Sequence, residues 1–237
     1  MDIRSAILFA LLSMALSCSA AKSDSSAPLP PPRPAGLSAP AAKPAALAVS
    51  PVATPDPACA RVFASKRLIV AAAPPVSGPN GCGIAAPVTL KAVVLADGTT
   101  VPFEPPSLIR CDLAEALGDW VHDDVAPAVQ PEGGLAKILG SVGYECRNRN
   151  HLATEKLSEH AKGNAVDLRG VVLRDGRQIL IQTQAEKPAF LARLKASACA
   201  RFRTVLGPGS DPAHALHLHV DLEQRRNNFR ICEWNVN

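Results

Sequence analysis

Four of the chain's six histidines lie in two short stretches, residues 158–167 and 214–219. The first stretch holds His160 and, seven positions later, Asp167. A Gly-Asn pair lies between them, and a turn at this pair can fold the loop back so that the imidazole faces the carboxylate. The spacing therefore predicts a His/Asp pair that reaches the start of a strand.

The second stretch alternates in the way a β-strand requires. His217 and His219 are separated by a leucine and followed by a valine, so on a strand both imidazoles would point to one face. Two imidazoles and one carboxylate form a ligand set that Zn²⁺ uses in catalytic sites, where the fourth position holds water. We therefore predict a mononuclear zinc hydrolase with the ligands His160, Asp167 and His219.

The amino-terminal residues have the layout of a secretory signal peptide. Arg4 precedes an apolar stretch over residues 5–16, too short to span a bilayer comfortably, and small residues follow it. We predict a signal peptide over residues 1–20. Cys18 could alternatively be the lipidated cysteine of a lipoprotein signal. Leu16 is bulky for such a processing site, so we keep a lipid on Cys18 as the alternative.

The next segment has a composition that opposes folding. Residues 21–57 are rich in alanine, proline and serine and contain no aromatic residue. Such a segment favours extended conformations and cannot bury enough apolar surface to fold. We interpret it as a disordered linker that precedes one folded domain over residues 58–237; a proline-rich ligand for a partner domain is the alternative.

The cysteines and the charges bound the class of protein. Six cysteines remain downstream of Cys18, and an even set indicates up to three disulfides in an oxidising compartment. Together with the signal peptide, they predict a periplasmic or secreted protein. The net charge of +4 is small and its basic residues are scattered, which argues against nucleic acid as a partner. We expect a monomer.

The remaining pattern mixes amphipathic and β-branched segments. Helices are expected over residues 111–129, with apolar residues at helical spacing, and over residues 188–200, with Pro188 in the first turn. Strands are expected at residues 87–95, 135–146, 165–173, 177–181, 205–206 and 217–222, while residues 59–70 fit a helix or a strand. The predicted fold class is α+β, with a small antiparallel sheet that carries the metal on one face and helices packed against the other.

The histidine stretches also carry a family resemblance. The motif Ser158-x-His160-x-x-Gly163-x-Ala165-x-Asp167, followed by His217-x-His219, resembles the zinc peptidases of D-alanyl-D-alanine metabolism. That group includes D,D-carboxypeptidases, D-Ala-D-Ala dipeptidases and penicillin-insensitive murein endopeptidases. More closely, residues 59–234 resemble the extensin-like C-terminal domain of bacterial exported proteins, through residues 144–147, 158–161, 207–211 and 230–233.

This resemblance implies a hedgehog/D-Ala-D-Ala-peptidase-like fold and the same three zinc ligands. It also implies that Arg147, which follows the only tyrosine at residue 144 by three positions, stabilises the transition state. Ser158 either caps a turn or forms a hydrogen bond to the substrate. The resemblance implies that the partners are the peptides of peptidoglycan. We expect contact with a membrane only through the signal peptide or a lipid on Cys18.

The general base is where this chain departs from the resemblance. Carboxypeptidase and dipeptidase members use a glutamate just before the last zinc-binding histidine, and this chain has no acid there. His217 and His214 instead match the endopeptidase pattern His-x-x-His-x-His, so we predict that His217, with His214 as the second choice, orients the water and transfers its proton. A non-catalytic wall-binding or structural module that retains the metal site is the alternative, and the bond cleaved and the choice between endo- and carboxypeptidase stay open.

Overall fold

The structure is a computed structural model that describes residues 56–182 and 188–236. The predicted signal peptide, Cys18 and nearly all of the predicted linker lie outside the described residues. The first element, α1 (Pro57–Ala64), starts at the last residue of that linker, and the Asp56 side chain caps it by accepting a 2.8 Å hydrogen bond from the amide of Ala58. The described residues contain no helix that is long and apolar enough to cross a membrane.

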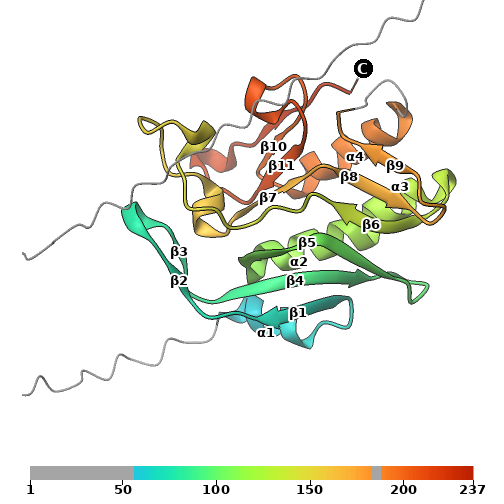
Figure 1. The fold of residues 1–237 in the computed structure, drawn as a ribbon, viewed down its shortest axis with the longest axis horizontal. Helices are drawn as coiled ribbons and strands as arrows, with labels where there is room; N and C mark the ends of the chain where they lie inside the picture. The colour runs from blue at the N-terminus through green and yellow to red at the C-terminus, as the bar shows by residue number, and fades with distance from the viewer. Residues whose placement is uncertain (1–55, 183–187, 237) are drawn as a thin grey trace, which may run out of the picture. The chain divides into compact units, whose positions relative to one another are not determined.

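The largest sheet has six strands in the order β1-β4-β5-β6-β8-β9 (Figure 1). Its members are β1 (Leu68–Ala72), β4 (Pro87–Val94), β5 (Thr100–Arg110), β6 (Leu135–Leu139), β8 (Gly170–Leu173) and β9 (Gln178–Leu180). The pair β5–β6 is parallel and the other pairs are antiparallel. The strands β8 and β9 pair as an antiparallel hairpin that turns around residues 175–176.

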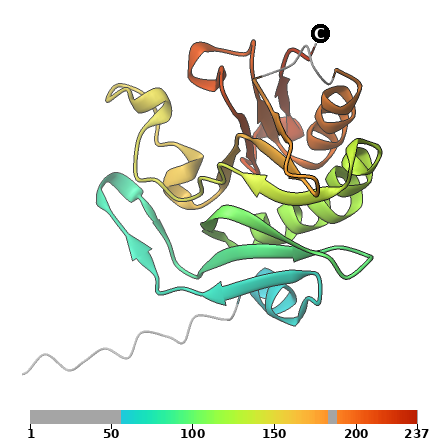
Figure 2. The same cartoon turned by 45° about the vertical axis from the view of Figure 1, so that its right-hand side comes forward.

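A second sheet has four strands in the order β12-β10-β11-β7. Its members are β7 (Ala165–Leu168), β10 (Thr204–Leu206), β11 (Leu218–Asp221) and β12 (Ile231–Glu233), and only β10–β12 is parallel. A separate two-stranded ribbon, β2 (Val76–Ser77) and β3 (Gly83–Ile84), extends from the end of the larger sheet (Figure 2). Short helical turns connect these strands at η1 (Pro79–Gly81), η4 (Arg149–His151), η5 (Glu159–Lys162), η7 (Pro212–His214) and η8 (Arg226–Asn228).

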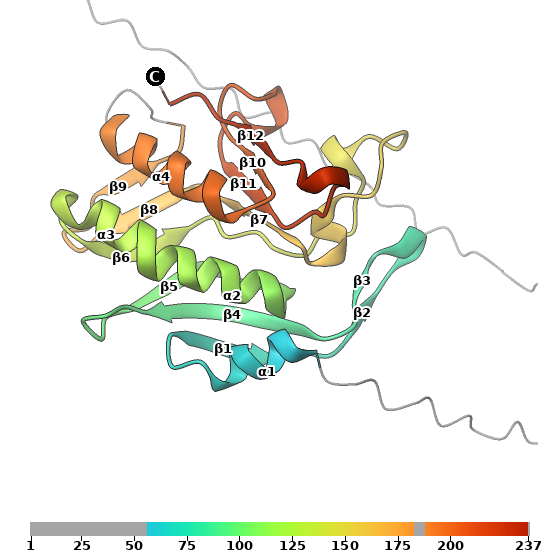
Figure 3. The ribbon, with the colours of Figure 1, turned by 180° about the vertical axis from the view of Figure 1, so that it is seen from behind.

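The long helices α2 (Cys111–Trp120) and α4 (Pro188–Arg201) lie on the same face of the larger sheet (Figure 3). A π-helical turn, η2 (Val121–Val125), and α3 (Ala126–Val129) continue α2, and a 3-10 turn, η3 (Gln130–Glu132), ends the run. The apolar residues that predicted the first helix are all buried, as are Phe190, Leu191 and Leu194 of α4. Phe202, which directly follows α4, packs edge-to-face with Trp120 of α2 with the ring centroids 5.4 Å apart, so the two helices share one core.

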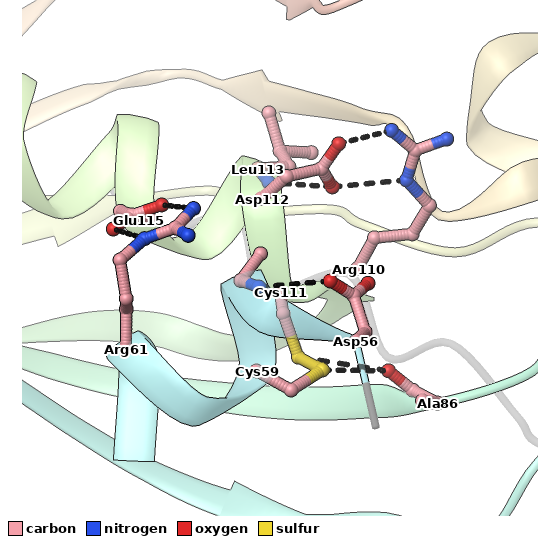
Figure 4. The surroundings of a disulfide bond; sticks show 10 residues. Asp56, Cys59, Arg61, Ala86, Arg110, Cys111, Asp112, Leu113 and Glu115 are labelled. Carbon is pink, nitrogen blue, oxygen red and sulfur yellow. Dashed lines mark hydrogen bonds and ion pairs between the residues drawn. A yellow bond between two sulfur atoms is a disulfide. The ribbon is translucent and has the colours of Figure 1, made fainter. Parts of the chain in front are cut away.

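The six downstream cysteines form three disulfides, which confirms the predicted framework. They are Cys59–Cys111, Cys82–Cys146 and Cys199–Cys232. The first joins α1 to the start of α2, beside the ion pair between Arg61 and Glu115 (Figure 4). The third joins α4 to β12 and so fixes the carboxy-terminal strand to the helical layer.

The α+β class is confirmed, and the sheet content is larger than predicted. Three sheets with two parallel pairs replace the single small antiparallel sheet. The expected strand over residues 135–146 ends at Leu139, because Gly140 adopts a left-handed conformation with φ of 67°. Beyond it the chain still crosses towards the second sheet, where Val142 and Asp167 exchange backbone hydrogen bonds of 3.0 Å.

Candidate functional site

His160 is placed by a short helical turn with a cap at each end. The Ser158 hydroxyl accepts a 3.3 Å hydrogen bond from the amide of His160, and η5 ends at Gly163, whose φ is 63°. A Cβ at Gly163 would lie 2.2 Å from Ile84, so a larger residue there would displace the turn. The His160 side chain is buried, and its Nδ1 donates a 2.7 Å hydrogen bond to the carbonyl of Gly143.

Asp167 and His219 face each other across the second sheet. They are directly paired residues of the antiparallel strands β7 and β11, so both side chains project from the same face. The Nδ1 of His219 lies 2.9 Å from Oδ1 of Asp167. The Nε2 of His160 lies 3.1 Å from that same oxygen and 3.1 Å from Nδ1 of His219. The structure thus brings the three predicted ligands together around one point.

The dimensions of this triangle fit a zinc ion. Bonds of about 2.0–2.1 Å to zinc place the corners of a tetrahedron roughly 3.3 Å apart. The three donor atoms are separated by 2.9, 3.1 and 3.1 Å, close to that spacing. The set of two imidazoles and one carboxylate also has the chemistry of a catalytic zinc site.

The outer hydrogen bonds of the two histidines direct lone pairs into the triangle. Because the carbonyl of Gly143 can only accept, the neutral His160 ring carries its proton on Nδ1 and its lone pair on Nε2. Likewise the Nε2 of His219 lies 3.2 Å from Oδ2 of Asp221, so its lone pair is on Nδ1. The lone pairs of three acceptor atoms, Nε2 of His160, Nδ1 of His219 and Oδ1 of Asp167, therefore point at one another. A cation between them, either a metal ion or a proton, removes this repulsion.

The pKa shifts of Asp167 and His219 also show that the triad favours a positive charge. Burial would raise the pKa of the Asp167 carboxyl, but hydrogen bonds from His160 and His219 outweigh it and hold the pKa well below its ordinary value. Burial would lower the pKa of His219, but hydrogen bonds to Asp167 and then Asp221 raise it to about 9. A proton on His219 and a metal ion thus compete for the same position.

The two candidate bases differ in how they are held. The Nδ1 of His214 lies 2.8 Å from both carboxylate oxygens of Asp211, which leaves Nε2 of the neutral ring as the acceptor. His217 precedes the first residue of β11, and its Nε2 lies 3.5 Å from Oδ1 of Asp167. Burial lowers the pKa of both rings, so both are neutral at pH 7 and able to accept a proton. The ring of His214 is 5.3 Å from that of His217, centroid to centroid.

The loop that carries His214 is packed against the carboxy-terminal segment. Asp211 caps η7 by accepting hydrogen bonds of 2.8 and 3.1 Å from the amides of Ala213 and His214. Gly207 begins the loop against Trp234, and a Cβ at Gly207 would lie 2.6 Å from the indole ring. These contacts orient the Asp211–His214 pair.

Arg147 lies beside the triad. Its guanidinium is 4.0 Å from Oδ2 of Asp167, and Nε donates a 2.7 Å hydrogen bond to Glu145. A pocket of about 240 Å³ opens on this region, and its wall includes Arg147, Ser158, His160, His214 and His219. All seven predicted site residues thus lie in one region, either in this wall or in contact with Asp167.

Several residues of the site were not predicted. Asp221 was missed although it follows His219 by two positions on a strand, the spacing that places both side chains on one face. Arg149 and Arg225 also line the pocket, and both pair with Glu223, yet no spacing in the sequence relates Arg149 to the other two. Only the fold brings them together.

Comparison with known proteins identified one family. The model described as extensin-like protein C-terminus matches residues 57–233, which is most of the chain and nearly all of its described part. No curated protein and no solved structure matched the chain.

Proposed function

The chain belongs to the extensin-like protein C-terminus family, and from its site we propose an exported zinc metallopeptidase that hydrolyses a D-amino-acid-containing peptide bond of peptidoglycan. The observation that carries the proposal is the convergence of His160, Asp167 and His219 at separations close to those of a zinc tetrahedron. The motif resemblance to zinc peptidases of D-alanyl-D-alanine metabolism supplies the substrate class. The three disulfides support an oxidising compartment.

We assign the general base to His214. Zinc held by the triad would supply Lewis acidity, which polarises a carbonyl and makes water nucleophilic at neutral pH. The Nε2 of His214 accepts the proton of the attacking water while Asp211 holds the opposite nitrogen in its protonated tautomer. The same proton then passes from Nε2 to the leaving amine. His217 has no comparable carboxylate partner on Nδ1 among the described residues, so it is the second candidate.

Arg147 has the position of an oxyanion donor. Its guanidinium approaches the outer oxygen of Asp167, and 17% of its side chain remains exposed at the pocket. From there it can donate to the negative charge that develops on the peptide oxygen in the transition state. Ser158 already caps η5, and its place in the pocket wall also allows it to contact the substrate.

The test is digestion of purified murein by the zinc-loaded protein, followed by mass analysis of the muropeptides. We expect a new product from cleavage of one peptide bond next to a D-amino acid, and its loss in the His160→Ala variant. The Asp211→Asn variant should bind zinc but cleave slowly, because His214 loses the partner that orients it. If the protein binds murein and zinc but releases no product, it is instead a wall-binding module that retains a metal site.

A further inference from the structure

A second polar cluster occupies the same pocket as the triad. Arg149 and Arg225 both contact the carboxylate of Glu223, Arg149 through a 2.7 Å bond to Oε1 and Arg225 through a short contact to Oε2. The three residues come from η4 and from the segment after β11, and both arginines line the pocket wall. We refer to Arg149, Glu223 and Arg225 as the arginine clamp.

The clamp has more cationic donors than its single carboxylate can use. Among the described residues, the Arg149 side chain bonds only to Glu223, through one of its five N–H donors. The clamp therefore carries one net positive charge. Three acids of the pocket wall already have partners: Asp211 contacts His214, Asp221 contacts His219, and Glu159 pairs with Lys162. Glu155, the wall's remaining unpaired acid among the described residues, is exposed.

The clamp is also connected to the triad. Arg225 donates a 2.8 Å hydrogen bond to the Thr204 hydroxyl, and Asp221, which lies opposite Thr204 in the sheet, contacts the ring of His219. Thr204 and Asp221 are directly paired residues of β10 and β11, so this chain of contacts runs across one sheet. A ligand held by the clamp would therefore lie against the same wall as His219.

From these contacts we propose that the arginine clamp is a subsite for a carboxylate of the peptide substrate. A guanidinium matches a carboxylate in a two-bond geometry, and Glu223 holds both guanidinium groups in place before the ligand arrives. The carboxylate belongs either to the carboxy terminus of the peptide or to an acidic side chain near the scissile bond. This inference rests on the proposed peptidase function, and it makes Arg149 and Arg225 determinants of specificity.

The experiment measures peptide binding by calorimetry at low salt with the zinc-loaded protein. The probes are an acetylated tripeptide with glutamate followed by two D-alanines, and versions with an amide at the carboxy terminus, at the side chain, or at both. We expect one of the two amide substitutions to weaken binding about 10- to 100-fold, the usual effect of losing a charged hydrogen-bond partner. That substitution identifies which carboxylate the clamp binds.

Variants then assign this discrimination to the clamp. Arg149 is partly exposed, so Arg149→Gln should fold and should bind acid and amide peptides equally, while Arg149→Lys should keep part of the preference. Arg174→Gln is the matched control: Arg174 is similarly exposed and pairs with Asp97 outside the pocket, so this variant should discriminate like the parent. The calorimetric affinities of the acid and amide peptides do not depend on finding a cleavage product.

The outcomes separate this inference from the proposed function. Equal binding of acid and amide peptides by the parent, or unchanged discrimination in Arg149→Gln, would overturn the carboxylate subsite even if murein is cleaved. Discrimination that depends on Arg149, without cleavage of any peptide bond, would keep the subsite and refute the hydrolase. An equal loss of affinity for acid and amide peptides in Arg149→Gln would also overturn it, because the ion pair with Glu223 would then only support the loop.

Discussion

Zinc and a proton should compete for the triad, and this competition can be measured without a substrate. Hydrogen bonds to Asp167 and Asp221 raise the pKa of His219 to about 9, so near pH 7 most metal-free molecules carry a proton on this ring. Zinc binds neutral imidazole, so each pH unit below the pKa should weaken its apparent affinity about tenfold. Raising the pH from about 6 to about 8 should therefore tighten zinc binding by roughly two orders of magnitude.

The assay is a competition titration against a fluorescent zinc indicator of known pH dependence. Calorimetry in two buffers with different ionisation enthalpies should report release of about one proton from His219 per zinc bound near pH 7. Asp221→Asn removes a carboxylate that raises the pKa of His219. In this variant the apparent zinc affinity should therefore stop rising with pH at a lower pH than in the parent. Asp175→Asn, which alters an exposed acid on the β8–β9 hairpin, should behave like the parent.

Two results would refute this reasoning. Equal apparent zinc affinity at both ends of the pH range would show that no proton is displaced from His219. Zinc binding that survives in the His160→Ala and Asp167→Asn variants would show that the metal lies elsewhere. Either result can be obtained even if the protein cleaves no peptide.

Further expectations concern the base, the disulfides, the linker and pH. His214→Ala should slow murein hydrolysis about 10²- to 10⁴-fold with zinc retained, more than His217→Ala does; the reverse order in product assays would return the role to His217. Replacing Cys199 and Cys232 by alanine opens a crosslink of 33 residues and should lower the free energy of unfolding by about 4 kcal/mol in urea titrations. A chain that starts at Asp56 should keep the urea midpoint of the longer chain. The metal-free protein should lose stability as pH rises from about 6.5 through about 9, because the raised pKa of His219 favours the folded state only while that ring is protonated; a flat urea midpoint over this range would contradict the assignment.

The local parts of the fold were predictable where one pattern dominated. Leu113, Leu117 and Trp120 recur at helical spacing, and α2 buries all three. The strand β4 was also clear, since its β-branched residues end at an Asp-Gly turn. By contrast, β5 contains Pro102, Pro105 and Pro106. Proline has no backbone N–H to donate to a neighbouring strand, so its presence argues against a strand when only the sequence is considered.

The site was predictable as a set of residues and less so as an arrangement. The spacing in the sequence predicted that His160, Asp167 and His219 would meet, and the structure brings them together. A turn between His160 and Asp167 and a strand that carries His219 leave few possible arrangements of the three side chains. It did not rank His214 above His217, since the contact between His214 and Asp211 depends on how η7 folds. The partners of distant arginines depend on sheet pairing, which no local pattern encodes.

The late position of β11 and β12 in the chain has a consequence for biogenesis. A chain that emerges amino terminus first presents His160 and Asp167 well before His219, which follows Asp167 by 52 residues. The β12 strand must then arrive before Cys232 can meet Cys199. Completion of the triad and oxidation of this cysteine pair therefore both wait for late strands of the domain, so a metal site built from all three residues would form only after β11 has docked.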